Sequence, residues 1–208
     1  CDLEIQDQRT LLISNLSSSG KDLSILVNNA AFVGTSSLEG WGVPFENQSI
    51  DTWRRAIEVN LTAVFDLCQG LSPIMASSQN PSIVNIASIY GLHAPDWSLY
   101  EGTTLGNPAA YGVSKGGLIQ LTRWLSTTLA PTVRVNAIAP GLFLTGRLQG
   151  MFDALAESER NEVLNAIPLK RMPEIDECVQ PVLFLASDAA SYMTGTVLDV
   201  NGGRLMPS

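Results

Sequence analysis

The sequence is short of basic residues and histidine, and each shortage excludes a class of protein. Lysine and arginine total 12 against 20 aspartate and glutamate residues, which gives a net charge of −8. A nucleic-acid-binding domain normally carries a basic stripe, so we expect no nucleic acid as a partner. The single histidine, His93, excludes a multi-histidine metal site, and we expect no bound metal.

Cysteines and long apolar runs are also scarce. Cys1, Cys68 and Cys178 are odd in number and far apart, so they match neither a disulfide framework nor a zinc spacing. No run reaches the ~18 apolar residues of a membrane span, and no signal peptide opens the chain. Hydrophobic residues still make up 45% of the 208 residues, enough to fill a core. We therefore expect one soluble, cytoplasmic domain over residues 1–208.

Apolar segments alternate with helical patterns along the chain. The apolar segments predict strands at 24–28, 82–87, 133–139 and 197–200. Apolar residues at helical spacing predict helices at 53–68, 111–129, 148–166 and 175–186, with Ser49 as the N-cap of the first. This alternation is typical of an α/β fold with a doubly wound, mainly parallel, Rossmann-like sheet. Residues 1–3 resemble the tail of a further strand, and a helix-like stretch follows without a glycine-rich turn.

Tyr111 and Lys115 are four residues apart in a predicted helix. Their side chains then share one face, with Cβ atoms about 5–6 Å apart. A lysine cation at that distance favours phenolate and lowers the tyrosine pKa, which makes Tyr111 usable as a general acid or base. The alternative is an exposed pair without a function.

Other polar residues follow or accompany the predicted strands. Ser88 comes directly after the 82–87 strand, where its hydroxyl either binds a substrate oxygen or forms an ordinary turn. Asn28 and Asn29 end the preceding strand, and for Asn28 we favour a structural hydrogen bond. Asn60 lies on the apolar face of its helix, where a buried amide must be satisfied. Its partner is either a neighbouring segment or a water molecule that relays protons.

These residues occur in an order that resembles the short-chain dehydrogenases/reductases across nearly the whole chain. The matching segments are Asn28-Asn29-Ala30-Ala31, Val59-Asn60-Leu61, Ser88, Tyr111-x-x-x-Lys115, Pro140-Gly141 with Thr145, and Thr194-Gly195 with Asn201-Gly202-Gly203. Within that family the chain is similar to the branch linked to flagellin and polysaccharide sugar modification. That likeness depends on Ser88-Ile89-Tyr90-Gly91 and the loop at 94–102.

The resemblance implies a role for each of these residues. Tyr111 would exchange a proton with the substrate oxygen, Ser88 would polarise the carbonyl, and Lys115 would lower the Tyr111 pKa and hold the nicotinamide ribose. Asn60 would keep a water that links Lys115 to solvent. The residues implied to contact NAD or NADP are Asp2, Leu3, Asn29, Ala30, Ala31, Tyr111, Lys115, Pro140, Gly141, Leu142 and Thr145. The implied reaction is hydride transfer between a secondary alcohol and a ketone.

The sequence also departs from the family pattern. Family members begin with a glycine-rich strand–helix turn and a second strand and helix, about 50–60 residues that are not in this sequence. We therefore interpret the chain as a fragment or a truncated product, expect an open apolar edge at the 24–28 strand, and expect weak dinucleotide binding if it is complete. The segment between Ser88 and Tyr111 is longer than usual. It is either a surface insertion or a substrate lid in which Asp96, Trp97 and Glu101 bind a sugar-like substrate.

Two functional hypotheses remain open. The first is an NAD- or NADP-dependent oxidoreductase acting on a small polar molecule. The second is a non-catalytic, truncated family member that serves only as an oligomerisation partner. The family implies a homodimer or homotetramer, in which Trp53 and Trp124 lie either in an interface or in the core. Gly116 and Gly117 inside a predicted helix cost about 1 kcal/mol each, which we explain by close helix packing.

Overall fold

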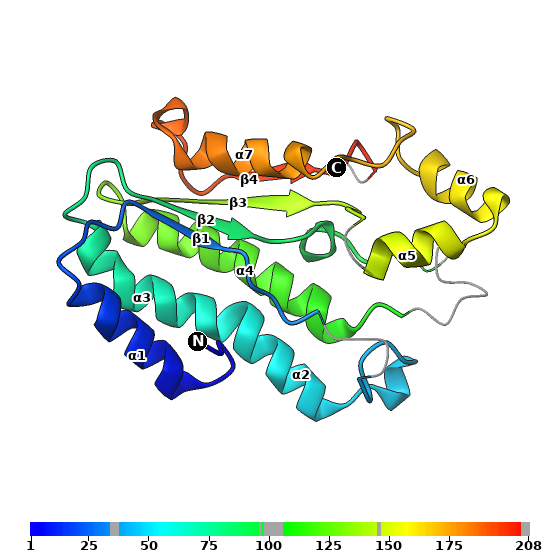
Figure 1. Cartoon of the computed structure of the whole chain (residues 1–208), viewed down its shortest axis with the longest axis horizontal. Coiled ribbons are helices and arrows are strands. Elements are labelled where there is room, and N and C mark those ends of the chain that lie inside the picture. Colours follow the sequence, from blue (N-terminus) through cyan, green and yellow to red (C-terminus); the bar gives the residue numbers. More distant parts are fainter. Residues whose placement is uncertain (34–37, 96, 98–105, 145–146, 205–208) are drawn as a thin grey trace.

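A four-stranded parallel sheet forms the centre of the computed structural model (Figure 1), which describes residues 1–33, 38–95, 97, 106–144 and 147–204. The strands are β1 (Ile25–Asn28), β2 (Ser82–Ile86), β3 (Arg134–Pro140) and β4 (Val197–Val200), in the spatial order β1-β2-β3-β4. Asn28 pairs with Asn85, and Ile83 pairs with Val135. All carboxyl ends therefore meet at one edge of the sheet, where the functional residues follow.

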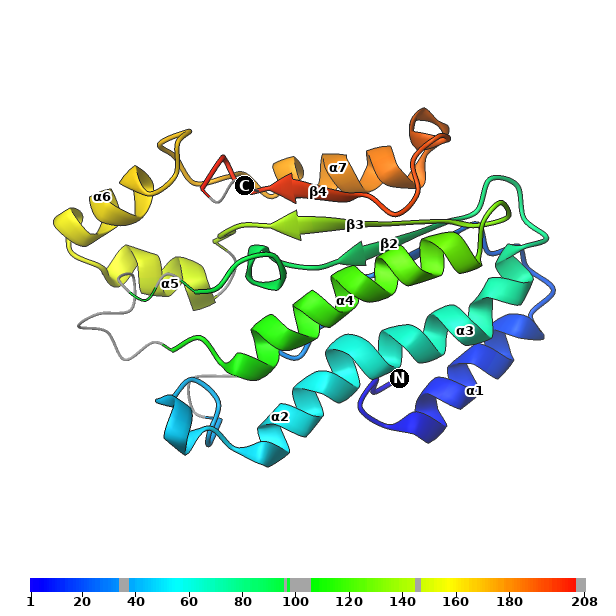
Figure 2. The ribbon, with the colours of Figure 1, turned by 180° about the vertical axis from the view of Figure 1, so that it is seen from behind.

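Helices cover both faces of this sheet (Figures 1 and 2). On one face lie α1 (Gln6–Ser17), α2 (Ile50–Ile57), the π-helical turn η2 (Glu58–Thr62), α3 (Ala63–Met75) and α4 (Ala109–Thr128). Ile83 and Val135 point into the core beneath α3 and α4, whereas Val84 and Ile138 pack against Leu185 of α7 (Asp176–Ala186). The two central strands, β2 and β3, are thus covered on both sides, as expected for a parallel sheet.

The remaining helices extend beyond the carboxyl ends of the strands. These are α5 (Arg147–Ala154) and α6 (Glu157–Asn165), which follow β3 in the chain (Figure 1). Short 3₁₀ turns form at η1 (Phe45–Asn47), η3 (Ile89–Gly91) and η5 (Asp188–Ala190). Within the described ranges, no helix combines the length and hydrophobicity that a membrane span needs.

Most predicted elements are confirmed to within two residues. Ser49 caps α2, where its side chain accepts from the Asp51 N–H. The helix predicted at 148–166 is two helices, because the helical conformation is interrupted between Ala154 and Glu157. The strand predicted at residues 1–3 is wrong. The Asp2 backbone oxygen accepts from the Ile5 N–H, and the Asp2 carboxylate accepts from the Glu4 N–H, so this segment is a turn.

β1 lies at an edge of the described sheet, as expected from the sequence. Ile25 and Val27 are 49% and 39% exposed, so apolar side chains of this strand face outward. Its last residue is buried: the Asn28 amide donates to Asn85 Oδ1 at 2.8 Å. Asn85 in turn donates to Thr122 on α4 at 2.9 Å. The structural interpretation of Asn28 is therefore confirmed.

Candidate active site

Ser88 and Tyr111 meet beyond the carboxyl end of β2. Ser88 is 6% exposed and caps η3, where its Oγ accepts from the Tyr90 N–H at 3.2 Å. A side-chain hydrogen bond also joins Ser88 to Tyr111 in the first turn of α4. Of the two roles that the sequence left open for Ser88, the turn is confirmed. Binding of a substrate oxygen stays a prediction.

Lys115 completes this cluster from the next turn of α4. Its side chain is 3% exposed, and Nζ donates to the Ile86 carbonyl at the end of β2 at 2.6 Å. Nζ lies 5.8 Å from the centre of the Tyr111 ring. The sequence prediction that these two side chains share one helix face is therefore correct. Burial lowers the pKa of Lys115 to about 8, because the apolar surroundings disfavour the ammonium form.

The Tyr111 pKa differs from the sequence expectation. Burial raises the pKa of Tyr111, and the hydrogen bond with Ser88 only partly offsets this effect. The predicted lowering by Lys115 is not found in the protein alone, because the ammonium lies over the ring rather than at the hydroxyl and donates to Ile86. In this state the phenol is a proton donor held by Ser88.

Asn60 occupies the π-helical turn η2 and is 1% exposed. Its amide donates to the Phe32 carbonyl at 3.2 Å and to Ser114 Oγ at 3.0 Å, and its Oδ1 accepts from the Phe32 N–H. Ser114 donates in turn to the Tyr111 carbonyl at 2.9 Å. The Asn60 side chain therefore binds neighbouring protein segments, and it joins the chain after β1 to the turn of α4 that carries Tyr111 and Lys115.

The residues predicted to contact a dinucleotide lie on separate segments. Asn29 and Ala30 are exposed and Ala31 is half-buried just after β1, while Pro140, Gly141 and Leu142 are half-buried at the end of β3. Asp2 and Leu3 lie in the turn before α1. Thr145 lies outside the described residues. The first two groups therefore follow the carboxyl ends of strands, where ligands bind in open α/β sheets.

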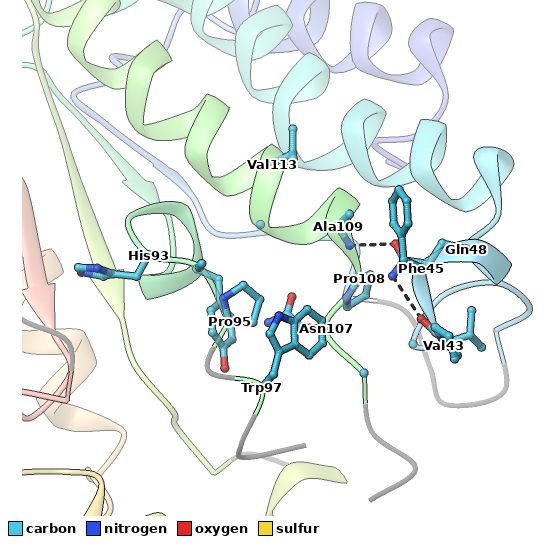
Figure 3. Close-up of a pocket in the computed structure, with 16 residues that line it drawn as sticks. Val43, Phe45, Gln48, His93, Pro95, Trp97, Asn107, Pro108, Ala109 and Val113 are labelled. Carbon is cyan, nitrogen blue, oxygen red and sulfur yellow. Dashed lines mark hydrogen bonds between the residues drawn. The ribbon is translucent and has the colours of Figure 1, made fainter. Parts of the chain in front are cut away.

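A cavity of about 830 Å³ opens beside this cluster (Figure 3). Trp97, Phe45, Tyr90 and Val113 contribute to its walls, and its described lining residues include no Asp, Glu, Lys or Arg. Gln48 joins two of the segments that line the cavity. Its Nε2 donates to the Val43 carbonyl at 3.2 Å, and its Oε1 accepts from the Ala109 N–H at 3.0 Å.

This cavity lies beside the cluster of Ser88, Tyr111 and Lys115, and none of these three residues lines it. Gly112 and Val113 line it but Tyr111 and Lys115 do not, because residues one and two positions apart point to different faces of a helix. Trp97, predicted to bind substrate, is 58% exposed at the rim of the cavity and not against the phenol. Asp96 and Glu101, predicted with it, lie outside the described residues.

Sequence reasoning missed two polar residues near the site. Ser114, fully buried, links Asn60 to Tyr111, and its place directly before Lys115 was the available signal. Arg9 is 2% exposed on α1 and pairs with two carboxylates. An isolated arginine in a helix gives no such signal, because its partners Glu58 and Asp66 are about 50 residues away in the sequence.

A parallel sheet between helices, with a hydroxyl, a phenol and a buried ammonium at its carboxyl edge, defines a Rossmann-like domain with an acid–base cluster. Residues 1–204 match the family model described as enoyl-(acyl carrier protein) reductase. The chain is 35% identical to the 3-oxoacyl-[acyl-carrier-protein] reductase of Thermotoga maritima over 187 residues. The chain belongs to the short-chain dehydrogenase/reductase family, as the sequence resemblance predicted.

Further comparisons agree with this assignment. The match with the Thermotoga maritima reductase covers 88% of this chain and 67% of that protein. Protein FixR of Bradyrhizobium diazoefficiens is 38% identical over 89% of this chain, which spans 60% of its length. The Pseudomonas aeruginosa RhlG/NADP active-site complex matches with a TM-score of 0.81 and 30% identity over 98% of this chain and 75% of that chain. NAD⁺-bound xylitol dehydrogenase matches with a TM-score of 0.80 and 27% identity over 98% and 77%.

Proposed function

We propose that the chain carries the proton-transfer site of an NAD- or NADP-dependent oxidoreductase that interconverts a secondary alcohol and a ketone. The observation that supports this most strongly is the buried cluster at the end of β2. There Ser88 is hydrogen-bonded to Tyr111, and Lys115 lies over the tyrosine ring. Family membership and the NADP- and NAD⁺-bound structural neighbours support the dinucleotide.

Each residue of the cluster has a distinct task in this reaction. In the reducing direction Tyr111 gives its proton to the carbonyl oxygen, and in the oxidising direction the phenolate takes the hydroxyl proton. Ser88 donates to the same oxygen and holds it beside the phenol. The nicotinamide, when bound, supplies or accepts the hydride. Lys115 provides a positive charge near the phenolate, while Asn60 and Ser114 hold the helix turn in place.

The residues present fit a bound ribose and nicotinamide. Lys115 Nζ has three N–H donors, and among the described residues only the Ile86 carbonyl accepts from it. The two others would bind the ribose hydroxyls. The small residues Ala30 and Ala31 after β1 and Gly141 after β3 would leave room for the ligand, with Asn29, Pro140 and Leu142 alongside. Thr145 is proposed as a further contact from the family resemblance alone. Asp2 and Leu3 would contact the adenine.

We propose a sugar-like substrate, as in the branch linked to flagellin and polysaccharide sugar modification. Trp97 would cover the distal part of the substrate from the cavity beside the site, together with Asp96 and Glu101. The match to xylitol dehydrogenase supports a polyol, whereas the match to a 3-oxoacyl reductase makes an acyl thioester the alternative to be tested.

Tyr111→Phe tests the proposed function because it removes the transferable proton and keeps the ring. We expect kcat to fall by about 10²–10⁴-fold, with unchanged folding by circular dichroism. The assay follows nicotinamide absorbance over polyols, sugars and 3-oxoacyl thioesters in the native polypeptide. Tyr192→Phe is the matched control, because Tyr192 is fully exposed. Activity of Tyr111→Phe within a few-fold of wild type would contradict the assignment.

We further infer that the protein acts in the cytoplasm as a homodimer or homotetramer. All three cysteines are free, and they are not paired with one another. Trp124 on α4 is 55% exposed and Phe65 on α3 is 40% exposed, which provides an apolar surface for a second copy. Trp53 instead packs against the buried cluster of Trp41, Ala56 and Ala110, so of the two tryptophans we assign only Trp124 to the interface.

A further inference from the structure

Arg9 is the only residue that α1 buries, and every residue of that helix is described. Each of its three side-chain nitrogens has an acceptor. Nε binds Asp66 of α3 at 2.8 Å, Nη2 binds Glu58 at the start of η2 at 2.7 Å, and Nη1 donates to the Leu3 carbonyl. The guanidinium therefore joins the turn before α1 to the segment that contains Asn60.

The turn at residues 2–4 is also held from its other sides. The Asp2 N–H donates to Gln8 at 2.7 Å. Glu4 forms two hydrogen bonds with Arg55 of α2, at 2.7 and 3.0 Å. These contacts restrain the two ends of the turn at its surface. Arg9 is the contact that reaches Leu3 from the interior, so it sets how far the turn lies from α3.

Helix packing alone does not account for a buried arginine. An apolar side chain of similar volume commonly serves as well as a buried ion pair, and α1 leaves Leu11 61% exposed. What an apolar residue could not supply is the hydrogen bond to the Leu3 carbonyl together with the two anchors on η2 and α3. The geometry of Arg9 therefore indicates a role in placing Leu3.

We propose that Arg9 is a positioning residue for dinucleotide binding, which fixes the Asp2–Leu3 turn at the distance that the adenine half requires. The inference rests on the proposed function, in which this turn contacts the adenine. Arg9 is itself covered by α1 and α3 and would touch no ligand atom. Its effect on binding would therefore be confined to the half of the dinucleotide that lies against the turn.

Fragments of the dinucleotide separate this role from a general structural one. ADP-ribose carries adenosine, both phosphates and the second ribose. Nicotinamide mononucleotide carries that ribose with one phosphate and the nicotinamide, but no adenosine. In the native polypeptide, calorimetric titration should show that Arg9→Met weakens ADP-ribose binding by about tenfold, with nicotinamide mononucleotide changed less than about twofold. Arg9→Lys keeps the charge but cannot reach three acceptors, so it should give an intermediate loss. If Arg9→Met does not fold, the two fragment affinities of Arg9→Lys test the proposal.

Arg54→Met is the matched control, because Arg54 is exposed on α2 and, among the residues that the structure describes, pairs only with Asp51, at 3.3 Å. It should leave both affinities unchanged. Equal weakening of the two fragments by the Arg9 variants, or no weakening of ADP-ribose, would overturn the inference while the proposed function stands. A wild-type protein that binds neither fragment would overturn the proposed function as well.

Discussion

Lys115 carries a charge at a position where the fold disfavours charge. Its side chain is 3% exposed, and burial lowers its pKa to about 8 from an ordinary value of 10.5. Each tenfold change in proton binding corresponds to about 1.4 kcal/mol. The ammonium that the proposed reaction needs therefore destabilises the folded protein at neutral pH, and a neutral side chain in its place would relieve that cost.

Lys115→Met should separate stability from activity. We expect the free energy of unfolding at pH 7 to rise by about 1–2 kcal/mol, after allowing for the lost hydrogen bond to Ile86, and activity to be lost. Between pH 8 and 10.5 the unfolded wild-type chain still binds the proton that the folded chain has released. Wild-type stability therefore rises with pH in that range, and the advantage of the variant disappears. Urea unfolding at several pH values measures this, and a variant less stable than wild type at pH 7 would contradict it.

At the residue scale, local spacing could be predicted and distant partners could not. The interval from Tyr111 to Lys115 placed both on one helix face because helix geometry is local. The contacts of Asn60 with Phe32 and Ser114 join residues 28 and 54 positions apart. Such contacts depend on how the elements pack, so the sequence showed only that the Asn60 amide needs partners.

Among the elements, η3 and α4 approach each other closely enough to exclude side chains. A Cβ on Gly91 would lie 2.6 Å from the Lys115 carbonyl carbon, and a Cβ on Gly117 would lie 2.8 Å from Leu61. The prediction that these glycines permit close packing is therefore supported for Gly117, whose neighbour Leu61 lies inside this chain. A Cβ on Gly116 would meet the Gly91 oxygen at 3.4 Å, an ordinary contact. Because η3 begins directly after Ser88, this contact sets the distance from Ser88 to α4.

Gly91→Ala should push η3 away from α4. The added methyl meets backbone atoms, which cannot rotate away, so we expect a loss of about 1–3 kcal/mol in stability. The activity at temperatures well below unfolding should fall as well, because Ser88 moves from Tyr111. In the control Gly150→Ala, the new Cβ on α5 has nothing within 4 Å, and stability should be unchanged or higher. If Gly91→Ala melts at the same temperature as the wild type, this contact does not set the spacing between η3 and α4.

Element types followed from the sequence more reliably than their interruptions. Continuous apolar runs indicated the strands and a period of 3.6 residues indicated the helices, and Val197–Val200 was predicted at its observed bounds. The π-helical turn at Glu58–Thr62 and the break between α5 and α6 carry no periodic signal. The π-helical turn carries the contact of Asn60 with Phe32, which forms only in the folded chain.

On the scale of the whole molecule, two of the exposed apolar surfaces among the described residues bear on assembly. One is β1, where Ile25 and Val27 face outward at an edge of the described sheet. The other is the side of α3 and α4 with Phe65 and Trp124. The family resemblance predicted an apolar edge at β1, because the strands that the family has beside it are not in this sequence. The surface on α3 and α4 is the candidate contact for a second copy.

Trp124→Glu tests this contact between copies. A buried carboxylate at the centre of an interface lacks a partner. We therefore expect a tetramer to dissociate to dimers, or a dimer to monomers, while each subunit stays folded. Light scattering combined with gel filtration measures the mass. Tyr192→Glu introduces the same charge at a fully exposed aromatic position and should leave the mass unchanged. An unchanged mass for Trp124→Glu would place the interface elsewhere.

The central claim concerns where the substrate oxygen binds, and a crystal structure with dinucleotide and a ketone or alcohol tests it most directly. The account predicts that this oxygen lies within hydrogen-bond distance of both Tyr111 Oη and Ser88 Oγ, with Lys115 Nζ on the ribose. A substrate oxygen bound away from Tyr111 and Ser88 would contradict the account.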